Sequence, residues 1–151
     1  MKVVRDNNPA LFFSKKETQA IVAAVEAAEL KTSGEIRVHL ERKAREPFVE
    51  HAQEIFEKIG MTTTKDRNGV LIFIGLASRR FVVLGDRGIH ERVPEGFWDE
   101  IVSRMGADFH DDRFADGIVQ AVHRIGEQLQ ALFPRQRDDV NELPNAISFS
   151  Y

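Results

Sequence analysis

The sequence contains no cysteine. Disulfide bonds, thiolate metal sites and a cysteine nucleophile are therefore excluded. It also lacks any run of eighteen apolar residues, the length that a helix needs to cross a bilayer, so we expect no insertion into a membrane. The N-terminal residues MKVVRDNN turn polar at once and lack the apolar stretch of a signal peptide. These absences favour a cytoplasmic protein.

A strong excess of either charge is missing as well. The 21 basic and 24 acidic residues are spread along a chain of 151 residues, which gives a net charge of −3. Proteins that bind nucleic acid usually carry a basic excess or a basic patch, so we expect no nucleic-acid partner. The apolar content of 42% and the length are ordinary for one globular domain with a substantial core.

Hydrophobic periodicity predicts four helices and at least three strands. Apolar residues recur at helical intervals over residues 15–30, 47–60, 95–109 and 112–133. Strict alternation over 35–40 predicts a strand with one wetter face, and the unbroken apolar run 69–74 predicts a strand that is buried on both faces. A third strand is expected at 81–84, and a weaker pattern over 89–93 suggests a fourth.

The lengths of the connections predict how the strands run. The link between 69–74 and 81–84 is too short for a crossover, so these strands should form an antiparallel hairpin. The strand at 35–40 reaches the next one through a helix, and the two should therefore be parallel. The expected fold is a three-layer α/β/α sandwich, with a small mixed sheet of about four strands and helices on both faces. We place this single domain at residues 14–134, after an N-terminal extension (1–13) and before a polar C-terminal tail (135–151).

This topology brings three distant segments to one edge of the sheet. The first two strands start there and the third ends there, and the oxygen-bearing side chains of these segments are Glu35, Asp66, Asn68 and Asp86, with Glu91 slightly further on. Crowded carboxylates repel and resist ionisation, and a hard cation removes that conflict. Thiolates are missing and no spaced histidine pair occurs, so Ca²⁺ or Mg²⁺ is favoured over zinc.

Each of these residues also has an ordinary structural explanation. Asp86 and Asn68 are common turn residues, Asp66 can pair with a neighbouring basic side chain, and Glu35 can be a solvated strand end. Three arginines could neutralise the edge without any ion: Arg37, Arg67 and Arg87. The sequence alone leaves both interpretations open.

Several histidines and acids outside this set could also serve as ligands or proton-transfer groups. His90 follows the turn at the same edge and is an outside candidate for a ligand or a proton-transfer group. The acidic cluster 108–112 resembles a metal motif, but the topology puts it at the far end of the sheet. We expect Asp111 or Asp112 to cap the helix 112–133. His39, on the wetter face of its strand, is expected to be solvated.

Parts of the sequence resemble the TPM domain family. The similar segments are 66–72, 81–89, Phe97-Trp98 and 114–118, and the likeness extends over residues 14–133. This family is named after a thylakoid-lumen phosphatase-like protein, a photosystem II repair protein and a nematode receptor-associated protein, and the chain is most similar to its short bacterial members. The resemblance implies an α/β/α fold, calcium binding at acidic loop positions, weak acid phosphatase activity in plant members, and accessory roles at membrane complexes. Only Asp66, Asn68 and Asp86 fall within the matching motifs.

Three functions follow as hypotheses. The first is a calcium-binding accessory or regulatory domain that acts through an unknown protein partner, for which the family resemblance implies a membrane complex. The alternative is a weak metal-assisted phosphomonoester hydrolase, in which Arg67 or Arg87 clamps the phosphate and His90 moves a proton. The third is an interaction domain that docks through residues 135–151.

Overall fold

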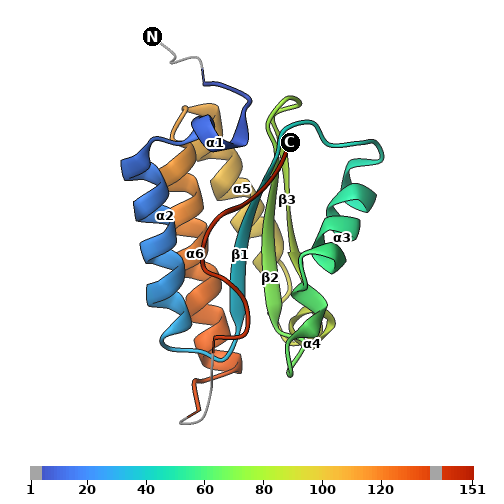
Figure 1. The fold of residues 1–151 in the computed structure, drawn as a ribbon. Helices are drawn as coiled ribbons and strands as arrows, with labels where there is room; N and C mark the ends of the chain where they lie inside the picture. The colour runs from blue at the N-terminus through green and yellow to red at the C-terminus, as the bar shows by residue number, and fades with distance from the viewer. Residues whose placement is uncertain (1–4, 137–140) are drawn as a thin grey trace.

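The computed structural model describes residues 5–136 and 141–151, and its centre is a four-stranded mixed sheet with the order β3-β2-β1-β4 (Figure 1). The strands are β1 (Glu35–Glu41), β2 (Gly69–Gly75), β3 (Arg80–Gly85) and β4 (Ser148–Ser150). As the link lengths predict, β1 and β2 are parallel whereas β2 and β3 are antiparallel. The fourth strand, β4, runs parallel to β1 on its other side.

The fourth strand predicted near residues 89–93 is wrong. This segment begins with the short helix α4 (Arg87–His90), because the Asp86 side chain accepts a hydrogen bond from the Arg87 N–H and caps the turn. The four longer helices lie close to their predicted bounds. In the described part of the chain the helices are α1 (Pro9–Phe12), α2 (Lys15–Glu29), α3 (Phe48–Lys58), the 3₁₀ helix η1 (Met61–Thr63), α4, α5 (Phe97–His110) and α6 (Phe114–Leu132).

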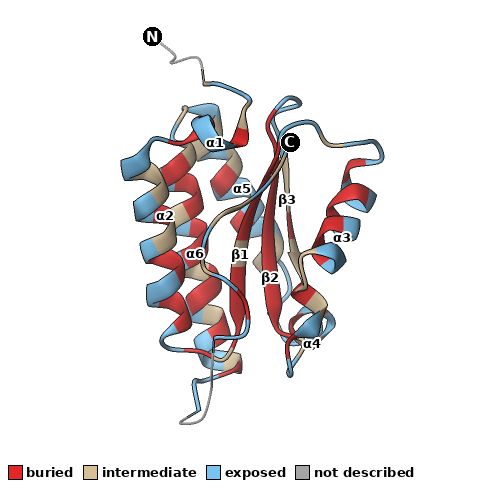
Figure 2. Ribbon diagram, viewed as in Figure 1, coloured by how far each residue is buried: buried red, intermediate tan, exposed pale blue. Residues whose placement is uncertain are grey.

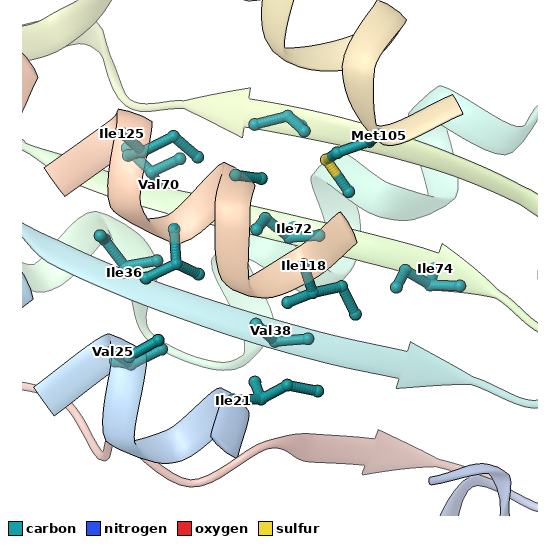
Figure 3. Close-up of a cluster of buried hydrophobic side chains, with 14 of the residues drawn as sticks. Ile21, Val25, Ile36, Val38, Val70, Ile72, Ile74, Met105, Ile118 and Ile125 are labelled. Atoms are coloured by element: carbon teal, nitrogen blue, oxygen red, sulfur yellow. The ribbon is translucent and has the colours of Figure 1, made fainter. Parts of the chain in front are cut away.

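The helices cover both faces of the sheet, which confirms the three-layer α/β/α architecture. Figure 1 shows α2 and α6 on one side of the strands and α3 on the other, and Figure 2 shows that each helix buries its inward face. On β2, Val70 and Ile72 pack against the α2–α6 layer (Figure 3), whereas Leu71 and Phe73 pack against α3. The alternation of side chains between two apolar layers explains why β2 is an unbroken apolar run.

The segments that flank the predicted domain also belong to the folded core. Phe12 and Phe13, from the predicted extension, are buried against the large apolar cluster. Leu143, from the predicted tail, is buried with the side chains of α3, and β4 extends the sheet. In the part of the chain that the structure describes, no helix combines the length and apolarity needed to span a membrane.

Candidate functional site

The sheet edge on which the cation hypothesis rests exists as predicted. Glu35 pairs with Gly69, and Val70 pairs with Gly85, so the starts of β1 and β2 lie beside the end of β3. The Glu35 N–H donates to the Asn68 carbonyl at 3.3 Å, and the Asp86 N–H donates to the Gly69 carbonyl at 2.9 Å. The backbone therefore brings these three distant segments together.

Asp86 is occupied by an arginine at this edge. The Arg67 guanidinium binds it in bidentate fashion, with Nε 2.6 Å from Oδ2 and Nη2 2.9 Å from Oδ1. Arg67 adopts a left-handed backbone conformation (φ 51°), and its hydrogen bonds to Asp86 raise the pKa of Arg67. Neutralisation by arginine, which the sequence left open, thus applies to Asp86, and the guanidinium predicted as a phosphate clamp is already engaged.

Four other predicted site residues lie on the surface. The side chains of Asp66, Arg87, His90 and Glu91 are exposed. The backbone of Asp66 contributes to packing, because its carbonyl oxygen and that of Arg67 lie closely against Gly88 in α4. None of these four side chains enters the buried part of the sheet edge.

Besides Asp86, three oxygen-bearing side chains near this edge are buried and hold an oxygen that is not already bound by a neighbouring donor: Glu29, Glu35 and Asn68, which are 5%, 2% and 1% exposed. Each is held on one side by a hydrogen bond. Glu29 Oε2 accepts from the Ile36 N–H at 2.8 Å, Glu35 Oε1 accepts from the Glu142 N–H at 2.6 Å, and Asn68 Nδ2 donates to Ser33 Oγ at 3.2 Å. The remaining oxygens, Glu29 Oε1, Glu35 Oε2 and Asn68 Oδ1, are buried, and no other group among the described residues donates a hydrogen bond to them; the carboxyl groups of Glu29 and Glu35 interact with each other through a shared proton.

The two glutamates resist ionisation together. Burial, with the neighbouring Glu35 as a second cause, raises the pKa of Glu29 to about 9. Burial also raises the pKa of Glu35. At neutral pH the pair therefore retains a proton, because two adjacent buried carboxylates cannot both be charged without compensation.

The donor set is small and consists of hard oxygen atoms. The described residues contain no cluster of three or more His, Asp or Glu side chains arranged to hold a metal ion. The candidate donors are instead the neighbouring carboxyl groups of Glu29 and Glu35 and the amide oxygen of Asn68, whose Nδ2 donates to the Ser33 hydroxyl. Arg37, which the sequence offered as a neutralising group, donates to the Ile59 carbonyl at 3.3 Å.

Glu29 is the residue that sequence reasoning missed. It lies at the end of α2, in a segment assigned to the packing of a helix. A signal was present, since positions 21, 25 and 29 are spaced four residues apart and Ile21 and Val25 are both buried. A carboxylate that continues a buried stripe is unusual and points to a special environment.

The prediction that His39 is solvated is wrong. Its side chain is 1% exposed and lies on the α3 face of the sheet, where its Nδ1 is 2.7 Å from Ser148 Oγ and its Nε2 is 2.9 Å from Glu41 Oε1. Burial lowers the pKa of His39. The unforeseen strand β4 covers this histidine, and the polar contacts fasten β4 to β1.

The acidic cluster 108–112 lies at the far end of the sheet, as predicted, but it does not cap α6. The cap residue is Arg113, whose guanidinium lies 3.1 Å from Asp108 and 3.3 Å from Asp111. Asp112 has a positive φ of 60°, so the chain turns through it instead of starting the helix there. An arginine thus compensates two of the acids.

The raised pKa of Glu29 predicts that stability falls as pH rises. The unfolded chain ionises Glu29 near 4.5 and the folded chain near 9. Between these values the folded state binds more protons, so the free energy of unfolding decreases with pH, by at most about 1.4 kcal/mol per unit for one proton. We expect Glu29→Gln to lose this slope in urea unfolding between about pH 5 and pH 8.5. The exposed Glu26→Gln should keep it, and a Glu29→Gln profile equal to the wild type would contradict the assignment.

Comparisons with known proteins agree with this architecture. The model of the TPM domain matches residues 7–128. The solution structure of the BA42 protein from the psychrophilic bacterium Bizionia argentinensis superposes with a TM-score of 0.88 at 37% identity, covering 96% of this chain and 100% of that one. The solution structure of the N-terminal domain of a protein from P. gingivalis superposes with a TM-score of 0.62 at 20% identity, covering 88% of this chain and 96% of that one, and shows the shared fold. No curated protein sequence matches the chain. The chain belongs to the TPM domain family.

Proposed function

We propose that the chain is a cation-binding accessory or regulatory domain, with Ca²⁺ as the favoured ion and Mg²⁺ as the second. Glu29, Glu35 and Asn68 would hold the ion. The observation that supports this proposal is the buried, interacting pair of carboxyl groups of Glu29 and Glu35, together with the buried Asn68 Oδ1, which has no hydrogen-bond partner among the described residues; these side chains come from α2, β1 and the turn before β2.

The donor chemistry fits such an ion. Carboxylate and amide oxygens are ligands that Ca²⁺ and Mg²⁺ take, with water completing the coordination. A cation would also offset the repulsion that keeps Glu29 and Glu35 from ionising together. With few protein ligands, we expect an affinity in the range of about 10⁻⁴ to 10⁻³ M. Two residues of the predicted set, Glu35 and Asn68, remain candidates; Glu29 is added, and Asp86 is engaged by Arg67.

The surroundings of Glu35 suggest how binding could be sensed. The Glu142 N–H donates to Glu35 Oε1, and the Lys65 N–H donates to Glu142 Oε2 at 3.2 Å. The C-terminal segment and the loop before β2 therefore both connect to the side chain that would bind the ion. An ion at Glu35 would change the strength of these two hydrogen bonds. It would thereby alter the surface formed by the C-terminal segment and the loop before β2, to which a partner protein would bind.

The proposal is tested by titration with CaCl₂ and MgCl₂, followed by calorimetry and ¹⁵N NMR. We expect saturable binding with the largest amide shifts at residues 29, 35 and 68, and a loss of affinity of at least about tenfold in Glu35→Gln. Because Glu29 must lose its proton, the heat of binding should depend on the ionisation enthalpy of the buffer.

A matched control separates the buried oxygens from the exposed acids. Glu91→Gln and Asp66→Asn remove carboxylates at the same edge of the sheet that are exposed. We expect both variants to bind as the wild type does. If Glu35→Gln binds equally well, or if no saturable binding occurs up to about 10 mM, the proposal is wrong.

A further inference from the structure

A cavity of about 410 Å³ lies at the end of the sheet opposite to the candidate cation site. It borders Gly75, the last residue of β2, whereas the candidate cation site adjoins Gly69, the first. Figure 1 shows the two ends of the sheet, with α1 at one end of the molecule and α4 at the other. Four aromatic rings from α1, β3, α5 and α6 line the cavity: Phe12, Phe81, Phe109 and Phe114.

The helix α5 leaves this space open at Gly106. A Cβ atom added to Gly106 would meet no heavy atom within 4 Å, although the residue lies in the helix and lines the cavity. Glycine in a helix interior is unfavourable relative to alanine, because it costs backbone entropy. The neighbouring Met105 is fully buried, so the helix packs normally on its other side. The cavity thus exists partly because a side chain is missing where one would fit.

The mouth of the cavity carries a cation without an acidic partner. The Arg79 guanidinium lies 5.2 Å from the centre of the Phe12 ring, and its one hydrogen bond within residues 5–136 and 141–151 is to the Arg5 carbonyl, at 3.4 Å. No carboxylate among the described residues forms an ion pair with it. Arg80, by contrast, is paired with Glu46 and lies over the Phe48 ring. Asp112 also lines the cavity, from the α5–α6 turn.

We propose that this cavity binds a small amphipathic anion, with an aromatic or short apolar body among the phenylalanine rings and a carboxylate, phosphate or sulfonate at Arg79. The volume lies within the range of small-molecule sites, and apolar walls with one charged group to fix orientation are typical of them. Asp112 repels an anion on the α5–α6 side, so the acidic group of the ligand points to Arg79. The inference does not depend on cation binding at the other edge of the sheet.

The charge requirement is tested with 2-naphthoate and its neutral analogue 2-naphthamide, titrated into ¹⁵N-labelled protein. We expect amide shifts confined to residues 75–81 and 105–112, and tighter binding of the naphthoate. Arg79→Met keeps an apolar side chain but removes the charge. It should weaken naphthoate by about fivefold or more and leave naphthamide unchanged. Equal affinities of the wild type for the two compounds would overturn the proposal.

The location is tested by filling the cavity. Gly106→Leu should reduce the affinity for both compounds at least tenfold, while the melting temperature stays equal to or above that of the wild type, because leucine favours the helix. Ser103→Leu places the same side chain on the exposed surface of α5 and should not change binding. Wild-type affinity in Gly106→Leu overturns the proposal. Should that variant be unstable, the Arg79→Met titration decides independently.

Discussion

Removal of residues 141–151 is expected to lower the free energy of unfolding by about 5 kcal/mol, which would leave little of the stability of an ordinary domain. The segment contributes Leu143, which is buried beside α3, and the strand β4, which pairs with β1. Loss of a buried leucine side chain costs about 2–5 kcal/mol, and each backbone hydrogen bond adds about 1 kcal/mol. The measurement is urea unfolding of the truncated and complete chains.

Two point variants show which part of this segment matters. Leu143→Ala should account for about 2–3 kcal/mol of the loss, because it removes the apolar contact alone. Tyr151→Ala changes a side chain that is 70% exposed and should have an effect below about 0.5 kcal/mol. A truncated chain as stable as the complete one would contradict this prediction and would be consistent with the third sequence hypothesis, in which residues 135–151 are a docking segment.

Gly88→Ala is expected to destabilise the protein by about 3 kcal/mol, through steric overlap. An added Cβ would lie 2.3 Å from the Asp66 carbonyl oxygen and 2.6 Å from that of Arg67. Both obstacles are backbone atoms, so no side chain can rotate away. The close approach also carries a hydrogen bond, from the Gly88 N–H to the Arg67 carbonyl at 2.9 Å. Thermal and urea unfolding measure the loss.

Gly106→Ala is the matched control for this variant. It makes the same chemical change in a helix where nothing opposes the new methyl group, and it should raise the free energy of unfolding by about 0.5–1 kcal/mol. The two glycine variants are thus expected to change stability in opposite directions. The steric explanation of Gly88 fails if both variants change it by the same amount and sign.

The directions of β1, β2 and β3 could be predicted because connection length constrains them. The link between β2 and β3, residues 76–79, is too short to carry a crossover, and a helix between two strands makes them parallel. The strand β4 could not be predicted, since Ser148-Phe149-Ser150 is too short and polar to show a periodic pattern. Its pairing depends on the uncovered edge of β1, more than 100 residues earlier. The missed burial of His39 follows directly from the missed strand.

The candidate site could be predicted in position but only partly in composition. Strand topology fixed the sheet edge, and with it Glu35 and Asn68. Arg67 pairs with Asp86 from a left-handed backbone conformation, and residue propensities do not indicate that conformation. The sequence therefore could not show whether Asp86 would bind an ion or pair with an arginine. Glu29 comes from a helix, outside the three segments that topology aligned, and only its spacing from Val25 linked it to the buried side.

The position of β4 has a consequence for how the chain matures during synthesis. Ser148, which touches His39, leaves the ribosome 109 residues after it. Throughout that interval, β4 is not available to pair with the backbone N–H and C=O groups on the outer side of β1, and unpaired strand edges can pair with other nascent chains. The arrival of β4 covers the end of this edge at residues 39–41 and contributes to the burial of the His39 imidazole, so this part of β1 is protected only after the segment 148–150 has been made.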